Sequence, residues 1–293
     1  MSILVKINHN TRYSYSTPVF LAPHLIRLRP APHCRTQILS YSLNIKPAQD
    51  SIHWQQDPFN NHIARLIFPD KLSELSLQVE ITADIVAFNA YDFFIDDYAM
   101  TWPFSYKEDL ALDLTSYLKP QVHDVSMHNF LSEFKHSSLS TLDFLIAINS
   151  NIYNRLRYVE RLESGVQSCD TTLTLESGSC RDSAWLLVQA LRCFGLAARF
   201  VSGYSLQLVD NISVQESAIK KDSTDLHAWT EVYVPGAGWI GLDPSSGLLA
   251  GEGYIPLCCT REPSSAAPVS GLSGACETTL HFENRVTRLS DRD

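Results

Sequence analysis

The sequence of 293 residues contains neither a long apolar run nor a set of cysteines at metal-binding spacing. No apolar stretch is long enough to cross a bilayer, and the opening MSILVKINHNTRYSYS alternates like a strand instead of forming a secretion leader. The seven cysteines are an odd number without CxxC spacing, which favours reduced thiols. These absences predict a cytoplasmic protein that makes no membrane contact.

The acidic balance and the glycine spacing exclude further classes of protein. A formal net charge of −9 argues against a nucleic-acid-binding surface. Neither a P-loop nor a dinucleotide-binding glycine pattern occurs. No metal or organic cofactor is expected, because His227 has no Cys or His partner at ligand spacing and the adjacent Cys258 and Cys259 do not form a tetrahedral set. What remains is a globular composition, 45% hydrophobic and 19% charged, in a chain long enough for two domains.

Residues 1–88 are predicted to form a β-rich domain, because apolar and polar residues alternate between Pro, Asn and Asp clusters. The stretch Asp57-Pro58-Phe59-Asn60-Asn61 suits a hairpin turn, since Asn tolerates left-handed backbone angles. Structural roles, and not metal binding, are expected for the histidines of this region: His9, His24, His33, His53 and His62. The basic run Arg27, Arg29 and Arg35 has two interpretations, an anion site and, as the favoured one, a solvated or salt-bridged strand face.

Residues 89–139 are predicted to form a mixed connector with short helices around 107–118 and 127–135, and residues 140–293 a core with a C-terminal β extension. A helix is expected from Ser140, with Ser140 as N-cap and Asp143 at N3. A second helix follows Ser177-Gly178-Ser179 and stops at Gly195.

Three strands are expected after that helix, in AARFVSGYSL, HAWTEVYV and WIGL. Between the first two lies a polar segment, about residues 207–225, that is expected to be a surface loop. A helix followed by antiparallel strands is an α+β pattern and not an alternating βαβ pattern.

Cys180, in GSCRDSAWLL, is the candidate nucleophile. In the first turn of a helix, the unpaired N–H groups and the macrodipole favour a thiolate. The same N–H groups can bind the oxyanion of an attacked carbonyl, a contribution of about 3 kcal/mol per donor. The alternative is a thiol that packs as a small hydrophobe, which suits Cys193 on the same helix; Cys180 is flanked by Ser and Arg instead.

His227 is the candidate base, and Asp243 the carboxylate that fixes its tautomer. If the hairpin loop is centred near Gly236, Asp243 pairs opposite Trp229 and lies diagonal to His227, with Cβ atoms roughly 7–8 Å apart. A register slip of one residue would turn Asp243 to the wrong face. The alternatives are a solvated strand histidine and a turn-forming Asp-Pro.

Several neighbours have open roles. The Cys180 N–H is one expected oxyanion donor, and the candidates for a second are Gln167, Tyr158 and Trp185. For Trp185 the favoured role is packing of the helix onto the sheet. Trp229 is expected either to wall the cleft or to pack in the core. Asp182 is expected to complement the helix dipole, and Arg181 to act electrostatically beside the thiolate.

The segments GSCRDSAW, DLHAW and GWIGLDP resemble the three signature segments of the bacterial transglutaminase-like superfamily. The N-terminal TRYSYSTPV, PHLIRLRPAPH and WQQDPFNNHIARL are similar to the β-domain before the core in many members, with DPFNN where relatives usually carry DPFGN. The resemblance implies an N-terminal antiparallel β-sandwich-like domain followed by a papain-like transglutaminase core. It gives Cys180 the role of nucleophile, His227 that of base and Asp243 that of its orienting partner. Some relatives continue well beyond the equivalent of residue 293, and the sequence leaves open whether this chain is complete.

The function expected from this resemblance is that of a cysteine protease or amidase that cleaves a peptide, amide or isopeptide bond through a thioester acyl-enzyme. The substrate is expected to be a peptide or protein amide. A true transglutaminase, which passes the acyl group to an amine, is the alternative within enzymes. A non-catalytic binding scaffold on the same fold is the alternative outside them. The sequence leaves the substrate and the oligomeric state open.

Overall fold

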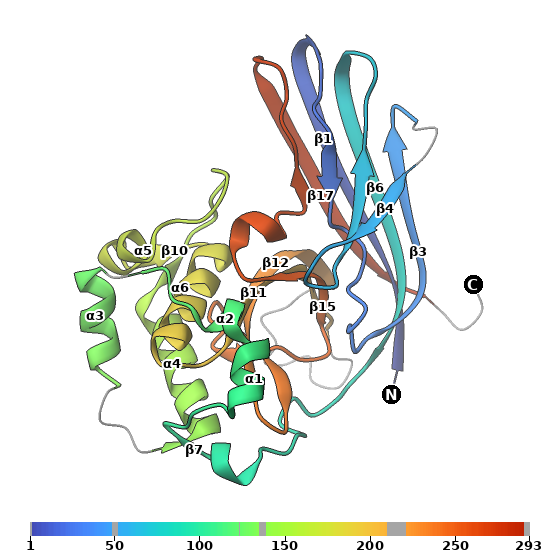
Figure 1. The fold of residues 1–293 in the computed structure, drawn as a ribbon. Coiled ribbons are helices and arrows are strands. Elements are labelled where there is room, and N and C mark those ends of the chain that lie inside the picture. The colour runs from blue at the N-terminus through green and yellow to red at the C-terminus, as the bar shows by residue number, and fades with distance from the viewer. Residues whose placement is uncertain (1, 49–51, 123, 135–138, 210–220, 290–293) are drawn as a thin grey trace.

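The computed structural model describes residues 2–48, 52–122, 124–134, 139–209 and 221–289, and it confirms the predicted α+β fold (Figure 1). The strands of the N-terminal region are β1 (Ser2–Val19), β2 (His24–Ile26), β3 (Gln37–Lys46), β4 (His53–Gln56), β5 (His62–Leu66) and β6 (Leu72–Val86). The connector contains η1 (Asp97–Ala99), β7 (Thr101–Trp102), α1 (Glu108–Asp113), α2 (Thr115–Leu118), α3 (Val125–Ser132) and β8 (Leu139–Ser140). The remaining elements are α4 (Thr141–Arg155), β9 (Arg157–Tyr158), α5 (Cys169–Leu175), β10 (Ser177–Gly178), α6 (Cys180–Cys193), β11 (Ala198–Gln207), β12 (Ser223–Val234), β13 (Gly238–Asp243), β14 (Leu248–Leu249), β15 (Tyr254–Thr260), η2 (Pro263–Ala266), β16 (Val269–Ser270) and β17 (Thr278–Arg288). Among the described residues, no helix is long and apolar enough to cross a membrane.

Two four-stranded sheets form the predicted N-terminal β-sandwich, in the orders β17-β1-β6-β3 and β16-β2-β5-β4. Strand β6 shows why they pack together, because its alternate residues turn inward and are fully or almost fully buried: Leu75, Leu77, Val79, Ile81, Ala83 and Ile85. The two C-terminal strands complete these sheets. β17 pairs antiparallel with β1 from Val5 opposite Arg288 to Tyr15 opposite Thr278, and β16 pairs with β2.

The predicted turn at residues 57–61 is present, and Asn60 adopts the left-handed conformation with a φ of 69°. The Asp57 carboxylate accepts hydrogen bonds from the Phe59 N–H at 2.9 Å and from the Asn61 N–H at 2.8 Å. The fully buried Asn61 side chain then reaches the core sheet, where its amide exchanges two hydrogen bonds with the backbone of Cys259, at 2.9 and 2.8 Å. This turn therefore fastens the N-terminal domain to β15.

Replacing Asn61 with Ala is expected to lower the free energy of unfolding by about 3 kcal/mol, because two buried backbone groups of Cys259 lose their partners. Urea denaturation followed by circular dichroism measures the change. The control is Asn60→Gly in the same turn, which suits the left-handed backbone and is expected to leave stability unchanged or slightly higher. If Asn61→Ala, like the control, left the free energy of unfolding unchanged, Asn61 would not fasten the N-terminal domain to β15.

In the core, the buried helix α6 lies across a five-stranded sheet of order β14-β13-β12-β11-β15. Helix α4 begins as predicted, with the Ser140 hydroxyl accepting from the Asp143 N–H at 3.1 Å. Helix α6 ends before Gly195, whose φ of +76° confirms the predicted stop. On the sheet face beneath α6, the Thr230 hydroxyl donates to the Ala184 carbonyl at 2.8 Å.

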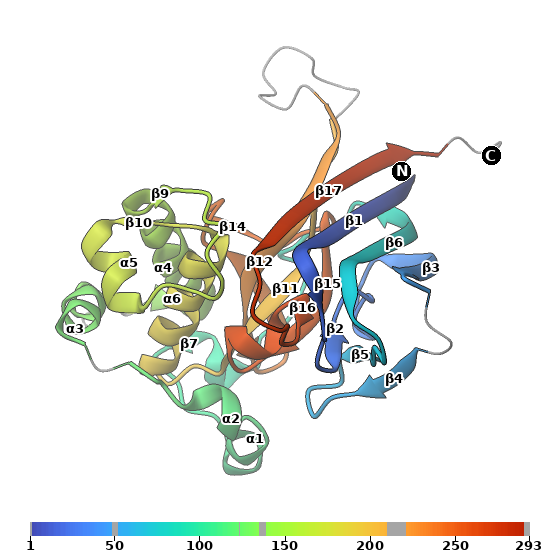
Figure 2. The same ribbon diagram turned by 90° about the horizontal axis from the view of Figure 1, so that it is seen from above.

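The opposite face of this sheet packs on the N-terminal sandwich, where Tyr204, Leu206, Ile255 and Leu257 join the same apolar core as β1 and β6. Figures 1 and 2 show helices α3 to α6 on one side of the sheet and the N-terminal strands on the other. Of the polar segment expected at about 207–225, residues 210–220 lie outside the described residues. The flanking strands extend further into it than expected, to Gln207 and from Ser223.

Candidate active site

Cys180 is the first residue of α6, and the short strand β10 leads directly into it. Its thiol is partly buried. Gly178 makes this sharp entry possible, because a Cβ at Gly178 would lie 2.8 Å from the Cβ of Asp182, closer than side chains approach one another. The structure therefore puts the sulfur beside the N–H groups of a first helical turn, as the sequence predicts.

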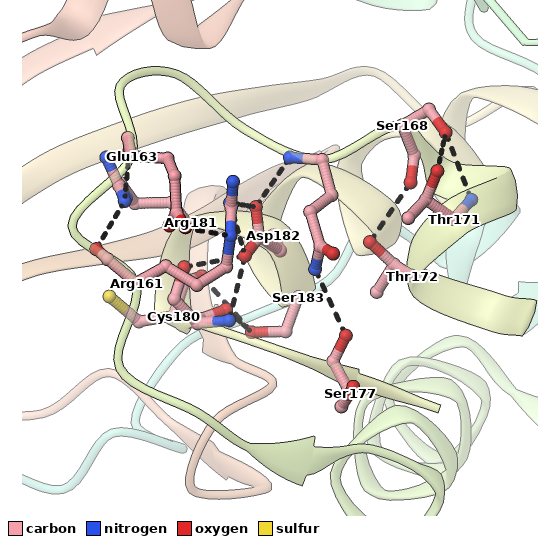
Figure 3. Close-up of polar contacts among 12 residues, drawn as sticks. Arg161, Glu163, Ser168, Thr171, Thr172, Ser177, Cys180, Arg181, Asp182 and Ser183 are labelled. Atoms are coloured by element: carbon pink, nitrogen blue, oxygen red, sulfur yellow. Dashed lines mark hydrogen bonds and ion pairs between the residues drawn. The ribbon is translucent and has the colours of Figure 1, made fainter. Parts of the chain in front are cut away.

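The Asp182 carboxylate ties the start of α6 to the segment after β9 (Figure 3). It is 1% exposed and accepts from the N–H and hydroxyl of Ser179 at 2.8 and 2.7 Å, from the Gln167 N–H at 2.7 Å, and from the Arg161 guanidinium at 2.8 and 2.9 Å. Burial alone raises the pKa of Asp182, but these donors outweigh it and hold the pKa below its ordinary value. Sequence reasoning assigned Asp182 to the helix dipole alone and missed these contacts. The Ser-x-x-Asp spacing from Ser179, which resembles a capping box, was the available signal.

Arg181 fixes the same segment from the neighbouring position. Its guanidinium donates to the carbonyls of Arg161 and Glu163 at 3.0 and 3.1 Å (Figure 3). Arg181 and Asp182 thus hold residues 161–167 against the first turn of the helix that carries Cys180. The nucleophile is supported by a short, hydrogen-bonded strap and not by helix packing alone.

Strands β12 and β13 form the predicted hairpin in the predicted register. Thr230 pairs with Leu242 and Val234 with Gly238, and continuation of this register puts Asp243 opposite Trp229. His227 and Asp243 consequently share a face, and His227 Nε2 lies 3.0 Å from Asp243 Oδ2.

Cys180 lies close enough to His227 to contribute to the raised pKa of its imidazole. Because Nε2 of the imidazole faces Asp243, Nδ1 is the nitrogen left for the thiol. The structure therefore brings together the three side chains that the sequence singled out, from one helix and two strands, in the order thiol, imidazole, carboxylate.

Two further side chains hold Asp243 in place. Its Oδ1 accepts from the N–H and hydroxyl of Ser245 at 2.9 and 2.7 Å, and its Oδ2 accepts from the Tyr254 hydroxyl at 2.7 Å. Sequence reasoning named neither residue. Ser245 was detectable, because an Asp side chain often bonds the N–H two residues on, whereas no local pattern points to Tyr254 on another strand.

Electrostatics of the pair favour a charged imidazole. Burial alone lowers the pKa of His227, but the hydrogen bonds to Asp243 and Cys180 and their charges outweigh it and raise the pKa to about 10. Burial alone likewise raises the pKa of Asp243, and the contacts with His227, Tyr254 and Ser245 lower it to about 2. At neutral pH, His227 is an imidazolium poised between a carboxylate and the sulfur.

The aromatic neighbours of His227 pack closely against it and against each other. Trp229 is 1% exposed, lies nearly parallel to the His227 ring at 6.4 Å between centroids, and meets Tyr254 edge-on at 5.2 Å. A Cβ at Gly203 would lie 2.4 Å from the Trp229 ring, so glycine in β11 makes room for it. Of the two roles expected for Trp229, the structure supports core packing.

The three candidates for a second oxyanion donor lie in different places relative to Cys180. Trp185 is 8% exposed and packs in the core beneath the helix, its favoured role. The Gln167 amide donates to the Ser177 carbonyl at 3.1 Å, just before the cysteine. Tyr158 lies beside Gly178 in the β9–β10 pair, and burial followed by the charge of Cys180 raises its pKa. Tyr158 therefore lies near the thiol, and Gln167 lies beside the strand that leads into Cys180.

One cluster of potential metal ligands exists among the described residues, away from the triad. The donor atoms of His33, Glu231 and Cys259 lie within 4.8 Å of one another. However, the Arg199 guanidinium binds Glu231 at 2.6 Å and lies 3.2 Å from His33 Nε2. A positive charge therefore already lies among these donors. The Arg199–Glu231 ion pair is buried within the core sheet, and His33 contacts it from the N-terminal domain.

Two family models match the chain. The bacterial transglutaminase-like N-terminal region matches residues 5–84, and the transglutaminase-like superfamily matches residues 129–244, which include Cys180, His227 and Asp243. The chain belongs to the transglutaminase-like superfamily, in the bacterial type with an N-terminal β-domain.

Individual proteins are also similar to this chain. The uncharacterized protein Rv2569c of Mycobacterium tuberculosis is 24% identical over 275 residues, which cover 91% of this chain and 86% of that protein. The uncharacterized protein ML0607 of Mycobacterium leprae is 32% identical over 114 residues, 39% of this chain and 38% of that protein. A crystal structure of a candidate cysteine protease from Cytophaga hutchinsonii superposes with a TM-score of 0.69 at 20% identity, covering 100% of this chain and 93% of that one. That likeness confirms the fold: the β-domain followed by a papain-like core.

Proposed function

We propose that this protein is a cysteine-dependent acyl-transfer enzyme that hydrolyses a peptide, amide or isopeptide bond. The observation that carries the proposal is the contact series from Cys180 through His227 to Asp243, with 3.0 Å between the imidazole and the carboxylate. A thiolate beside an imidazolium at the start of a helix is a prepared nucleophile for a carbonyl carbon.

In the first half of the reaction, Cys180 Sγ attacks the amide carbonyl and forms a tetrahedral oxyanion. The Cys180 N–H and a second donor from Gln167 or Tyr158 stabilise that oxyanion. His227 then gives its proton to the leaving amine, the C–N bond breaks, and a thioester remains on the sulfur. Asp243 keeps the imidazole oriented and compensates its charge throughout.

In the second half, a water molecule attacks the thioester and His227 accepts its proton. Collapse of the tetrahedral intermediate breaks the C–S bond, releases the carboxylic acid and restores the thiolate–imidazolium pair. An amine in place of water would give transglutamination by the same steps, so the acceptor decides between the two outcomes.

A screen of peptide and isopeptide amides, with and without an added primary amine, tests the proposal, with Cys180→Ala as the control. Release of acid that amine leaves unchanged, and that the variant lacks, is the expected result. Incorporation of amine would replace hydrolysis with transglutamination. Neither release nor incorporation across the screen would favour a binding scaffold.

The alkaline limb of the pH–rate profile is expected to follow His227. The imidazolium is the acid that protonates the leaving amine, and its pKa is raised to about 10. The rate should therefore hold above neutral pH and fall as the pH rises through about 10, when that proton is lost. Initial rates on the best amide of the screen, at constant ionic strength, measure the limb. A fall centred near the ordinary histidine pKa of 6.5 would contradict this charge state.

A further inference from the structure

A groove of about 730 Å³ opens between strands β3 and β4 of the N-terminal sandwich. We call it the β3–β4 groove, and the residues that define its chemistry are Arg29, Arg35, Tyr41, Ile52, Trp54 and His62. Figures 1 and 2 both show β3 and β4 on the far side of the molecule from α6. The groove is therefore separate from the candidate active site.

The groove is bordered by the edges of two sheets. β3 and β4 are the outermost strands of their sheets in the part of the chain that the structure describes. Residues 37–43 of β3 line the groove without interruption. Because successive side chains of a strand point to opposite faces, an uninterrupted run of lining residues means that the backbone edge of β3 borders the opening. Such an edge offers N–H and C=O groups to an added strand.

The groove is also positively charged, in a chain with a net charge of −9. Its described lining includes Arg29 and Arg35 and no Asp or Glu. Neither arginine forms an ion pair within the described residues. Of the solvated or salt-bridged face favoured from the sequence, only the solvated form applies to them there, and Arg35 is exposed. Arg27, by contrast, is buried and donates to the Ala267 carbonyl and the Ser270 hydroxyl, which makes it structural.

Aromatic rings hold Arg29 in a fixed orientation. Its guanidinium lies 5.1 Å from the centre of the Trp54 ring and 5.7 Å from that of Tyr41, and the two rings meet edge-on at 6.1 Å. A guanidinium packed on aromatic faces keeps its N–H edge available for a carboxylate. Trp54 is itself 40% exposed, and the buried Tyr41 hydroxyl lacks a partner among the described residues. The groove therefore combines the oriented guanidinium of Arg29 with the Tyr41 hydroxyl and the exposed ring of Trp54.

We propose that the β3–β4 groove binds an extended, acidic segment of another polypeptide. The backbone of that segment would pair with the edge of β3, its carboxylates would meet Arg29 and Arg35, and its apolar side chains would pack on Trp54 and Ile52. A volume of about 730 Å³ beside an open strand edge suits a chain and not a single small ion. This binding surface is independent of the chemistry proposed at Cys180.

Fluorescence anisotropy with a labelled octapeptide of alternating Glu and Tyr tests the proposal. The Cys180→Ala protein is used, so that cleavage cannot consume the probe. The acidic peptide is expected to bind, more weakly at high salt, and a peptide with Gln in place of Glu is expected to bind at least about tenfold more weakly. The double variant Arg29→Gln, Arg35→Gln should lose affinity to a similar degree.

Three further proteins make the result decisive. Arg285→Gln removes the same charge from an exposed site on β17, the opposite edge of the same sheet, and should bind normally. Arg29→Lys keeps the charge but loses the planar group, and should be intermediate. Arg35→Gln alone changes an exposed side chain, so its weaker binding cannot be attributed to misfolding.

Any one of the following results would overturn the proposal. The first is equal binding of the acidic and Gln peptides, and the second is an equal loss in Arg285→Gln and the double variant. The third is no binding by the parent protein, or displacement of the peptide by low concentrations of inorganic phosphate, which would indicate a small-anion site.

Discussion

Replacing His227 with Ala is expected to lower the rate of amide hydrolysis by about 10⁴-fold or more, to the level of Cys180→Ala. Without the imidazole, the thiol has no proton acceptor and the leaving amine no proton donor. Because the two residues act as one unit, the double variant should be no slower than either single variant. Initial rates on the amide identified by the screen measure all three, with circular dichroism to confirm folding.

Cys193 provides the matched control for the thiol. It is the last residue of the helix that Cys180 begins, and it is partly buried. Cys193→Ala should retain near-parental activity, because its sulfur has no contact with the imidazole–carboxylate pair. Comparable losses in Cys193→Ala and Cys180→Ala would mean that the helix, and not the nucleophile, is being disturbed.

Replacing Asp182 with Ala is expected to lower the free energy of unfolding by about 3–5 kcal/mol, a large share of the stability of a domain. The change removes the acceptor of Ser179 and Gln167. It also leaves the guanidinium of Arg161, 18% exposed, with only the more distant carboxylate of Glu163, at 3.6 Å. Residues 161–167 lose their hydrogen bonds to the first turn of α6. Activity should therefore fall even at temperatures where the variant is folded. Urea denaturation and initial rates measure the two effects separately.

Asp170→Ala is the control for a first-turn aspartate. Asp170 is exposed in the first turn of α5 and accepts one hydrogen bond from the Ser126 hydroxyl, at 2.7 Å. Replacing it should lower the free energy of unfolding by less than about 1 kcal/mol, which is the range of an exposed charge–dipole interaction. If Asp182→Ala costs no more than this control, Asp182 serves the helix dipole alone and its hydrogen-bond network contributes little.

Features set by nearby residues could be predicted from the sequence. The Ser140 cap, the stop at Gly195 and the helical start at Cys180 each depend on one turn of chain. The hairpin register depended on placing the loop near Gly236, and once that is fixed, period two dictates that His227 and Asp243 share a face. The pairing of His227 with Asp243 followed from these local rules, whereas the approach of Cys180 to His227 was implied by the family resemblance.

Features that join distant segments could not be predicted. The Tyr254 hydroxyl reaches Asp243 from a different strand, and Arg161 reaches Asp182 from a segment without regular structure. The pairing of β17 with β1 joins residues more than 260 positions apart, and many strands with the same alternation could have taken that place. Alternation tells which face of a strand is buried but not which neighbour it meets.

Competitive alkylation shows whether His227 activates the thiol of Cys180. The protein is treated with limiting iodoacetamide at about pH 6, where ordinary thiols are almost fully protonated. Peptide mass spectrometry then gives the extent of labelling at each of the seven cysteines. Cys180 is expected to be labelled well ahead of the other six, because His227 lies beside it, and His227→Ala is expected to abolish this preference. Labelling of Cys180 no faster than the partly buried Cys34 and Cys276, or unaffected by His227→Ala, would contradict this expectation.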